Sequence, residues 1–113
     1  MRQVVWLGDT KKNLMEFPVE VMQRIGFQLH LVQSGEIPSD VKPFNGVGSG
    51  VFEITVQYDK EAYRCVHVVQ LGEYIYILHV FHKKSKRGIA TPKQDVDLIK
   101  QRYADARRLA DDK

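Results

Sequence analysis

The sequence is poor in the features that mark secreted and membrane-spanning proteins. Cys65 is its single cysteine among 113 residues, so no disulfide can form within the chain. No stretch approaches the roughly 18 to 20 apolar residues that a membrane-spanning helix needs. The apolar run near the N-terminus, VVWLG, is too short for a secretion signal. We therefore expect a cytoplasmic protein with no membrane partner, and a buried role for Cys65, which lies in the apolar run CVHVV.

Motifs for metals and nucleotides are also missing. The chain has four histidines and one cysteine, but their spacing matches no zinc-binding pattern. The glycine-rich stretch GVGSG, residues 46–50, lacks the helix and the Lys-Ser/Thr pair of a phosphate-binding loop. No Ser-His-Asp arrangement can be recognised from residue order. These absences predict a protein without metal or cofactor.

The composition is that of one ordinary globular domain, residues 1–113. Apolar residues make up 43% of the chain and charged residues 27%, which is typical of a folded protein. The net charge of +3 is mildly basic, so the position of the cations matters more than their number.

The order of apolar patterns predicts an α+β fold. Apolar residues at three- and four-residue steps between Pro18 and Gly35 indicate an amphipathic helix. Three later segments with short turns between them indicate an antiparallel meander. The expected elements are a strand at 4–8, a short helix near 11, a helix after Pro18, a loop at 36–50, strands at 51–59, 63–70 and 74–84, and a helix from Thr91-Pro92. This β-α-α-β-β-β-α order predicts a small antiparallel sheet with helices packed on one side.

The third strand of the meander runs into a cluster of cations. HVFHKKSKRGIATPK, residues 79–93, contains five lysines and arginines and no acid. Arg64 begins the strand expected to pair with it, and Lys42 belongs to the loop before the meander. Cations that converge on one edge of a sheet attract phosphate, because neutralised phosphates release counterions. The alternative reading is a solvated strand end followed by a loop.

Such an edge could carry metal-free RNA cleavage. The 2′-hydroxyl of RNA can attack the adjacent phosphate if a base, an acid and cations are present. Arg64 would hold the phosphate with its planar guanidinium, one of the crowded lysines would act as base, and His82 would carry a proton. We expect His79 to be a hydrogen-bonded structural histidine and Glu53 to orient Arg64.

Several segments resemble a known toxin family. EITV (53–56), YRCV (63–66), YILHVFHKKSKRGIATPK (76–93) and DLIKQRYADA (97–106) resemble the RelE/ParE toxin superfamily. VWLG, FPVEV, QSGEIPSDVKPF and GVGSG are similar to its HigB-type, phage-derived branch. The resemblance covers nearly the whole chain, and the order and spacing of the motifs make it fairly specific.

The resemblance implies a RelE-like fold and a toxin of a type II toxin–antitoxin pair. Many members are mRNA interferases, which cut mRNA in the ribosomal A site without metal, so ribosome and mRNA would be partners. A small helix-turn-helix antitoxin would bind this branch. The family's basic residues correspond to Arg64, Lys83 and Lys84, with His82 between strand and loop. The resulting prediction is a catalytic set and an RNA-binding set: Arg64, His82, Lys83 and Lys84, and Lys42, Lys86, Arg87 and Lys93.

One position departs from the branch pattern and leaves an alternative open. Thr55 stands where the branch usually has an arginine after Glu-Ile, so one cation of the expected active face is missing. The alternative function is a non-enzymatic toxin or binding module, either a gyrase inhibitor or a degenerate phage-derived homologue.

Overall fold

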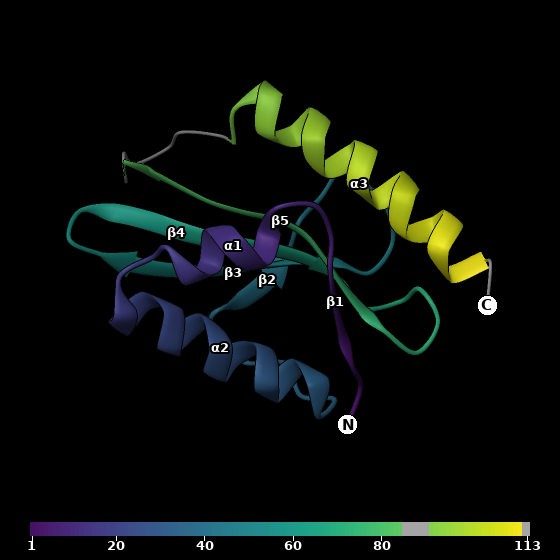
Figure 1. Ribbon diagram of the computed structural model, residues 1–113, viewed down its shortest axis with the longest axis horizontal. Helices are drawn as coiled ribbons and strands as arrows, with labels where there is room; N and C mark the ends of the chain where they lie inside the picture. The colour runs from purple at the N-terminus through teal and green to yellow at the C-terminus, as the bar shows by residue number, and fades with distance from the viewer. Residues whose placement is uncertain (85–90, 112–113) are drawn as a thin grey trace.

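The structure is a computed structural model that describes residues 1–84 and 91–111 (Figure 1). Its helices and strands follow the order expected from the sequence, with one extra strand. They are β1 Val4–Trp6, α1 Thr10–Met15, α2 Val19–Gln33, β2 Val41–Pro43, β3 Val51–Tyr58, β4 Glu61–Val68, β5 Ile75–Lys84 and α3 Lys93–Asp111. None of the helices in these ranges combines the length and apolar character that crossing a bilayer requires.

The strands form one five-stranded sheet in the order β1-β5-β4-β3-β2. The meander β3-β4-β5 is antiparallel as predicted, and the α+β class is confirmed. The sheet is mixed, however, because β1 pairs in parallel with β5, with Val4 opposite Ile75. The expected loop at 36–50 also contains β2, which pairs with β3 at the sheet edge. Pro43 fits there because an edge strand does not need every backbone donor.

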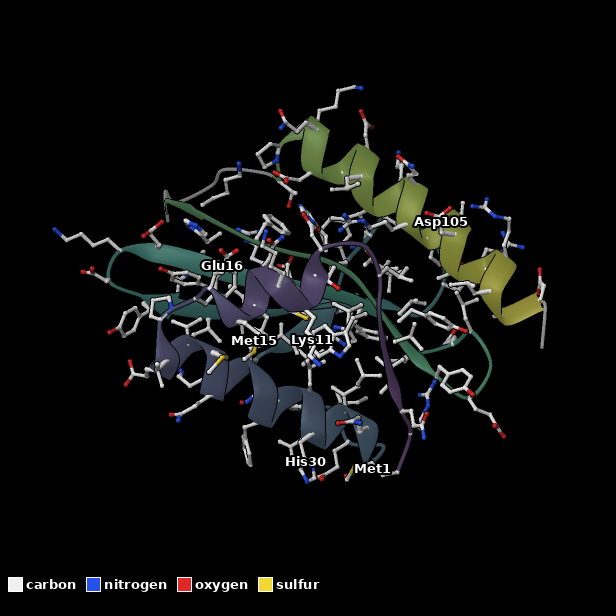
Figure 2. All side chains as sticks on the ribbon, viewed as in Figure 1. Met1, Lys11, Met15, Glu16, His30 and Asp105 are labelled. Carbon is white, nitrogen blue, oxygen red and sulfur yellow. The ribbon has the colours of Figure 1, made fainter. Side chains whose placement is uncertain are left out.

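Helices α1 and α2 cover one face of the sheet, as expected. The predicted apolar stripe of α2 is buried and joins a core cluster with alternate residues of β3, β4 and β5. Helix α3 packs with the intervening residues of the same strands and therefore lies on the opposite face. Figure 1 shows this order of layers, with α3 above the sheet and α2 below it. In Figure 2, Asp105 on α3 and His30 on α2 accordingly lie on opposite sides of the strands.

A β-bulge interrupts the pairing of β4 with β5. His67 lies opposite Ile77, but the preceding residue, Val66, lies opposite His79. Leu78 is therefore an extra residue on β5. An extra residue reverses the alternation of side chains beyond it. Ile77 packs in the core on the α2 side, whereas after the bulge it is Val80, an even-numbered residue, that packs there.

Hydrogen bonds from Arg102 connect α3 to the rest of the domain. Its guanidinium donates to the backbone oxygen of Leu78 at 3.0 Å and to the Asp9 carboxylate at 2.9 Å. The same contact lowers the pKa of Asp9, chiefly through the hydrogen bond from Arg102. Gly8 is required beside it, because a Cβ on that residue would overlap the guanidinium. One side chain thus joins α3 to β5 and to the start of α1.

Two glycines provide a matched test of packing. A Cβ on Gly48 would overlap the ring of Tyr103 on α3, whereas a Cβ on Gly26 in α2 meets no atom within 4 Å. Gly48→Ala should lower the free energy of unfolding by about 1–3 kcal/mol, as overpacking does. Gly26→Ala should raise it by about 1 kcal/mol, since alanine favours the helix. Chemical denaturation of both variants measures the difference, and equal effects would contradict the packing of Gly48 against α3.

A second prediction concerns His67, which is fully buried. Burial lowers its pKa from 6.5 to about 4. The unfolded chain therefore binds the extra proton first as pH falls, and stability should drop between about pH 6.5 and pH 4. The expected loss from pH 7 to pH 5 is about 2 kcal/mol. Denaturation midpoints of the wild type and His67→Leu at both pH values measure it; an unchanged pH dependence in the variant would contradict this assignment.

Candidate nucleic-acid interface

Arg64 lies on the α3 face of the sheet. It is opposite Thr55 on β3 and Phe81 on β5. Its Nη1 is 3.6 Å from Oε2 of Glu53 and donates to Oγ1 of Thr91 at 3.3 Å. The Arg64 side chain is 23% exposed, whereas that of Glu53 is 6% exposed. The predicted ion pair of Glu53 with Arg64 is therefore present, and the Arg64 side chain in it stays partly exposed to solvent.

Lys83 joins Arg64 on this face because Lys83 is two positions along β5 from Phe81, the partner of Arg64. Its Nζ is 3.6 Å from Oδ2 of Asp95, and its side chain is 49% exposed. Asp95 belongs to the first turn of α3. Both cations thus lie where the start of α3 meets the sheet, next to Thr91 and Asp95 respectively. We call Arg64 and Lys83 the cation pair.

His79 anchors the carboxylate that faces Lys83. Its Nε2 donates to Oδ1 of Asp95 at 2.8 Å, and its ring stacks on Phe81 with centroids 4.4 Å apart. Burial lowers the pKa of His79, and Asp95 opposes this shift. Because Nε2 carries the proton, Nδ1 is the bare nitrogen, and it is buried without a partner among the described residues. The predicted hydrogen-bonded role of His79 is confirmed.

His82 does not lie with the cation pair, although the sequence grouped it with Arg64 and Lys83. It is opposite Tyr63 and stacks on that ring at 5.1 Å, on the face covered by α1. Its Nδ1 donates to Oε1 of Glu61 at 2.8 Å, and Phe17 lies edge-on to it at 5.8 Å. The β-bulge explains this separation, because it reverses which side chains of β5 share a face with Arg64.

The remaining predicted residues fall into three groups. Lys42 is exposed and lies opposite Glu53, so it shares the face of Arg64. Lys93 is exposed at the start of α3, and its ion pair with Asp97 raises its pKa. The backbone of Lys84 lies opposite Glu61. The predictions for the Lys84 side chain, Lys86 and Arg87 lie outside the described residues.

Sequence reasoning missed Thr91 and Asp95 as members of this site. The sequence contained a usable signal. Thr91-Pro92 starts a helix, and Asp95 in the first turn of that helix lies near the preceding strand. Thr55, which replaces an expected arginine, donates to Oε1 of Glu53 at 3.1 Å. Among the described residues, no three His, Cys, Asp or Glu side chains are grouped so that they could hold a metal ion.

The cation pair is held loosely by its carboxylates. Both ion pairs have N–O distances of 3.6 Å, longer than the roughly 2.7–2.9 Å of a close charge-assisted hydrogen bond. Oε2 of Glu53, Oδ2 of Asp95 and Nε of Arg64 are buried without hydrogen-bond partners among the described residues. An anionic group can therefore bind on the exposed side of both cations without breaking strong hydrogen bonds within the protein.

Asp95 and Asp97 allow a matched test on one helix. Asp95→Asn keeps the side-chain shape but removes the charge that faces His79 and Lys83. It should lower the free energy of unfolding by about 1–3 kcal/mol and lower the pKa of His79 further, since the contact with Asp95 raises that pKa. Asp97→Asn, which affects only the exposed pair with Lys93, should leave both nearly unchanged. Denaturation and NMR titration of His79 measure these effects, and an unshifted His79 pKa in Asp95→Asn would contradict the contact.

The profile of the family described as "Phage derived protein Gp49-like (DUF891)" matches residues 12–104. This match covers α2, the whole meander and most of α3, including the cation pair and Asp95. The search of curated proteins found no matching sequence. Since the family profile spans well over half of the chain, the protein belongs to the Gp49-like family of phage-derived proteins.

Proposed function

We propose that the protein is the toxin of a type II toxin–antitoxin pair and cleaves mRNA on the ribosome in the cytoplasm. The observation that carries this proposal is the cation pair, in which Arg64 and Lys83 share one face at the start of α3. Membership of a phage-derived family supports it, as does the resemblance to HigB-type toxins. The expected partners are ribosome, mRNA and a helix-turn-helix antitoxin.

The cation pair is suited to a phosphate whose charge increases during reaction. When a 2′-hydroxyl attacks the neighbouring phosphorus, the bond to the 5′ oxygen breaks and a 2′,3′-cyclic phosphate forms. Arg64 offers a rigid fork of N–H donors, and Glu53 and Thr91 hold that fork in place. Lys83 adds a second charge on a flexible stem. A cation held in position before the reaction, as Arg64 is by Thr91 and Glu53, stabilises the transition state with little reorganisation.

Proton transfer is assigned to Lys83, which shares the face of Arg64; the resemblance to the toxin family alone suggests Lys84 as a second proton carrier. The 2′-hydroxyl must lose a proton, and the 5′ oxygen must gain one. His82 receives no step in this proposal, because it lies on the α1 face and is bonded to Glu61. His79 acts as a positioning residue, since it holds the Asp95 carboxylate that faces Lys83.

Thr55 supports a second candidate, a toxin without nuclease activity. On the α3 face, Arg64 pairs with Glu53 and Lys83 pairs with Asp95, so these four residues carry no net charge. Thr55 adds no cation there and instead donates to Glu53. A face with so little excess positive charge could bind a partner such as gyrase without cleaving RNA. Growth arrest with intact transcripts and broken DNA would favour this candidate.

The nuclease proposal predicts a clear mutational pattern in bacteria. Wild-type expression should arrest growth and create new mRNA 5′ ends within translated codons. Arg64→Ala and Lys83→Ala should each slow cleavage by about 100-fold or more, as loss of one donor to a transition-state charge does elsewhere. Sequencing of 5′ ends over time after induction measures the rate.

Two further variants serve as controls for position and charge. Lys100→Ala removes an exposed lysine from α3, and His82→Gln removes the histidine from the opposite face. Both should cleave at about the wild-type rate. Unchanged cleavage by the double variant Arg64→Ala/Lys83→Ala would disprove the assignment to the cation pair.

A further inference from the structure

The two most exposed large apolar side chains in the described part of the chain lie at one end of the domain. Ile37 is 80% exposed and Met1 is 76% exposed. The N-terminus lies beside the end of α2 (Figure 1), where the backbone N–H of Arg2 donates to the backbone oxygen of Gln33 at 3.2 Å. Arg2 and Gly35 line two hollows there, one together with Met1 and the other together with Ile37. The two apolar side chains therefore belong to one surface patch.

Ile37 lies at the edge of a hollow of about 220 Å³ between the end of α2 and the sheet. Its apolar walls come from α2, β2, β3 and the segment after β4, and are formed by Val32, Val41, Phe52 and Val69. His67 also lines it but is fully buried, so that residue offers no accessible polar atom. An apolar cavity of about 150 Å³ is large enough for benzene. This hollow therefore has room for an isoleucine side chain.

The polar residues around the hollow carry opposite charges. Glu36 and Gln70 are exposed, and Arg2 lines the hollow with them. Arg2 donates from Nε to the backbone oxygen of Glu73 at 3.2 Å and from Nη2 to that of Val69 at 2.6 Å. These bonds fix the guanidinium and leave Nη1 outside them. Glu36 forms no ion pair with another residue in the described ranges. The patch thus presents a fixed cation and an uncompensated carboxylate.

We propose that this patch is the interface of a symmetric homodimer, in which Ile37 of each copy fills the hollow of the other. The patch carries both a protruding apolar side chain and a hollow that accommodates it, and a two-fold axis brings each to its complement. The same axis brings Glu36 of one copy to Arg2 of the other, so the charges are complementary as well. Gln70 fits a self-complementary surface because its amide both donates and accepts.

The interface lies away from the cation pair. Arg2 also donates to the backbone oxygen of Tyr74, directly before β5, whereas Lys83 is near the end of that strand. A strand rises by about 3.3 Å per residue, so roughly 25 Å separates the two positions. The hollow is on the α2 side of the sheet, and the cation pair is on the α3 side. Dimerisation therefore leaves both cation pairs exposed, and it does not depend on the proposed nuclease activity.

Sedimentation of the full chain at increasing concentration tests the dimer. A patch with one apolar anchor per copy is small, so we expect a dissociation constant of about 10–100 µM. Ile37→Asp should weaken dimerisation by about 100-fold or more, because the anchor is lost twice in each dimer. Phe27→Asp is the control, since Phe27 is exposed on α2 and does not line the hollow; it should leave the constant unchanged. A wild type that stays monomeric at about 1 mM would overturn the proposal, as would a dimer that Ile37→Asp does not weaken.

A charge reversal tests the pairing across the two-fold axis. Glu36→Lys places a cation opposite Arg2 of the second copy and should weaken dimerisation by about tenfold. Glu20→Lys makes the same change of charge at an exposed residue of α2 that does not line the hollow, and should have no effect. Equal dissociation constants for these two variants would contradict the proposed interface.

NMR locates the interface in the wild type and therefore decides the question even if a variant fails to fold. In an equal mixture of isotope-labelled and unlabelled chains, filtered NOE spectra report only contacts between copies. The methyl groups of Ile37 should show such contacts with the ring of Phe52 and the methyl groups of Val69. A dimer without these contacts would use another surface and would overturn the proposal.

Discussion

The β-bulge between β4 and β5 decides which side chains can act together in this protein. Before the bulge, odd-numbered residues of β5 face α2; after it, odd-numbered residues face α3. Lys83 and His79 therefore share the face of Arg64, and His82 does not. If the pairing of His67 with Ile77 continued along β5 without the bulge, Arg64 would lie opposite Val80. Arg64 would then share its face with His82, since the alternation of a strand has a period of two. A single inserted residue thus selects a lysine rather than a histidine as the neighbour of Arg64.

The local patterns of the sequence were enough to predict most of the fold. The stripe of α2 and the alternation of β3 indicated their burial correctly, because helical and strand periods depend on neighbouring residues. The misses are features that arise from distant contacts. The parallel pairing of Val4 with Ile75 joins residues far apart in the sequence, and β2 is ordered only by β3 beside it. The position of α3 on the second face of the sheet was also missed. Helix α3 packs there because the strands carry buried apolar residues on both faces.

The candidate site was predictable where it depends on the hairpin. Pairing of β4 with β5 brings Arg64 near Lys83, and cross-strand neighbours bring Glu53 near Arg64. The bulge leaves no mark in the local pattern of β5, so the separation of His82 from Arg64 could not be predicted from that pattern. Thr91 and Asp95 were missed because their role depends on where α3 returns to the sheet. The contacts of Arg102 with Leu78 and Asp9 fix that return.

Arg64 is better suited than a lysine would be to bind an anion without destabilising the domain. Glu53 is almost completely buried, and a buried carboxylate without a partner is costly. A lysine that turned toward a phosphate would withdraw its single charge from Glu53. The guanidinium instead has five N–H donors in a fixed plane. It can keep Nη1 on Glu53 and Thr91 while other donors meet the anion, so binding at this position leaves the buried charge compensated.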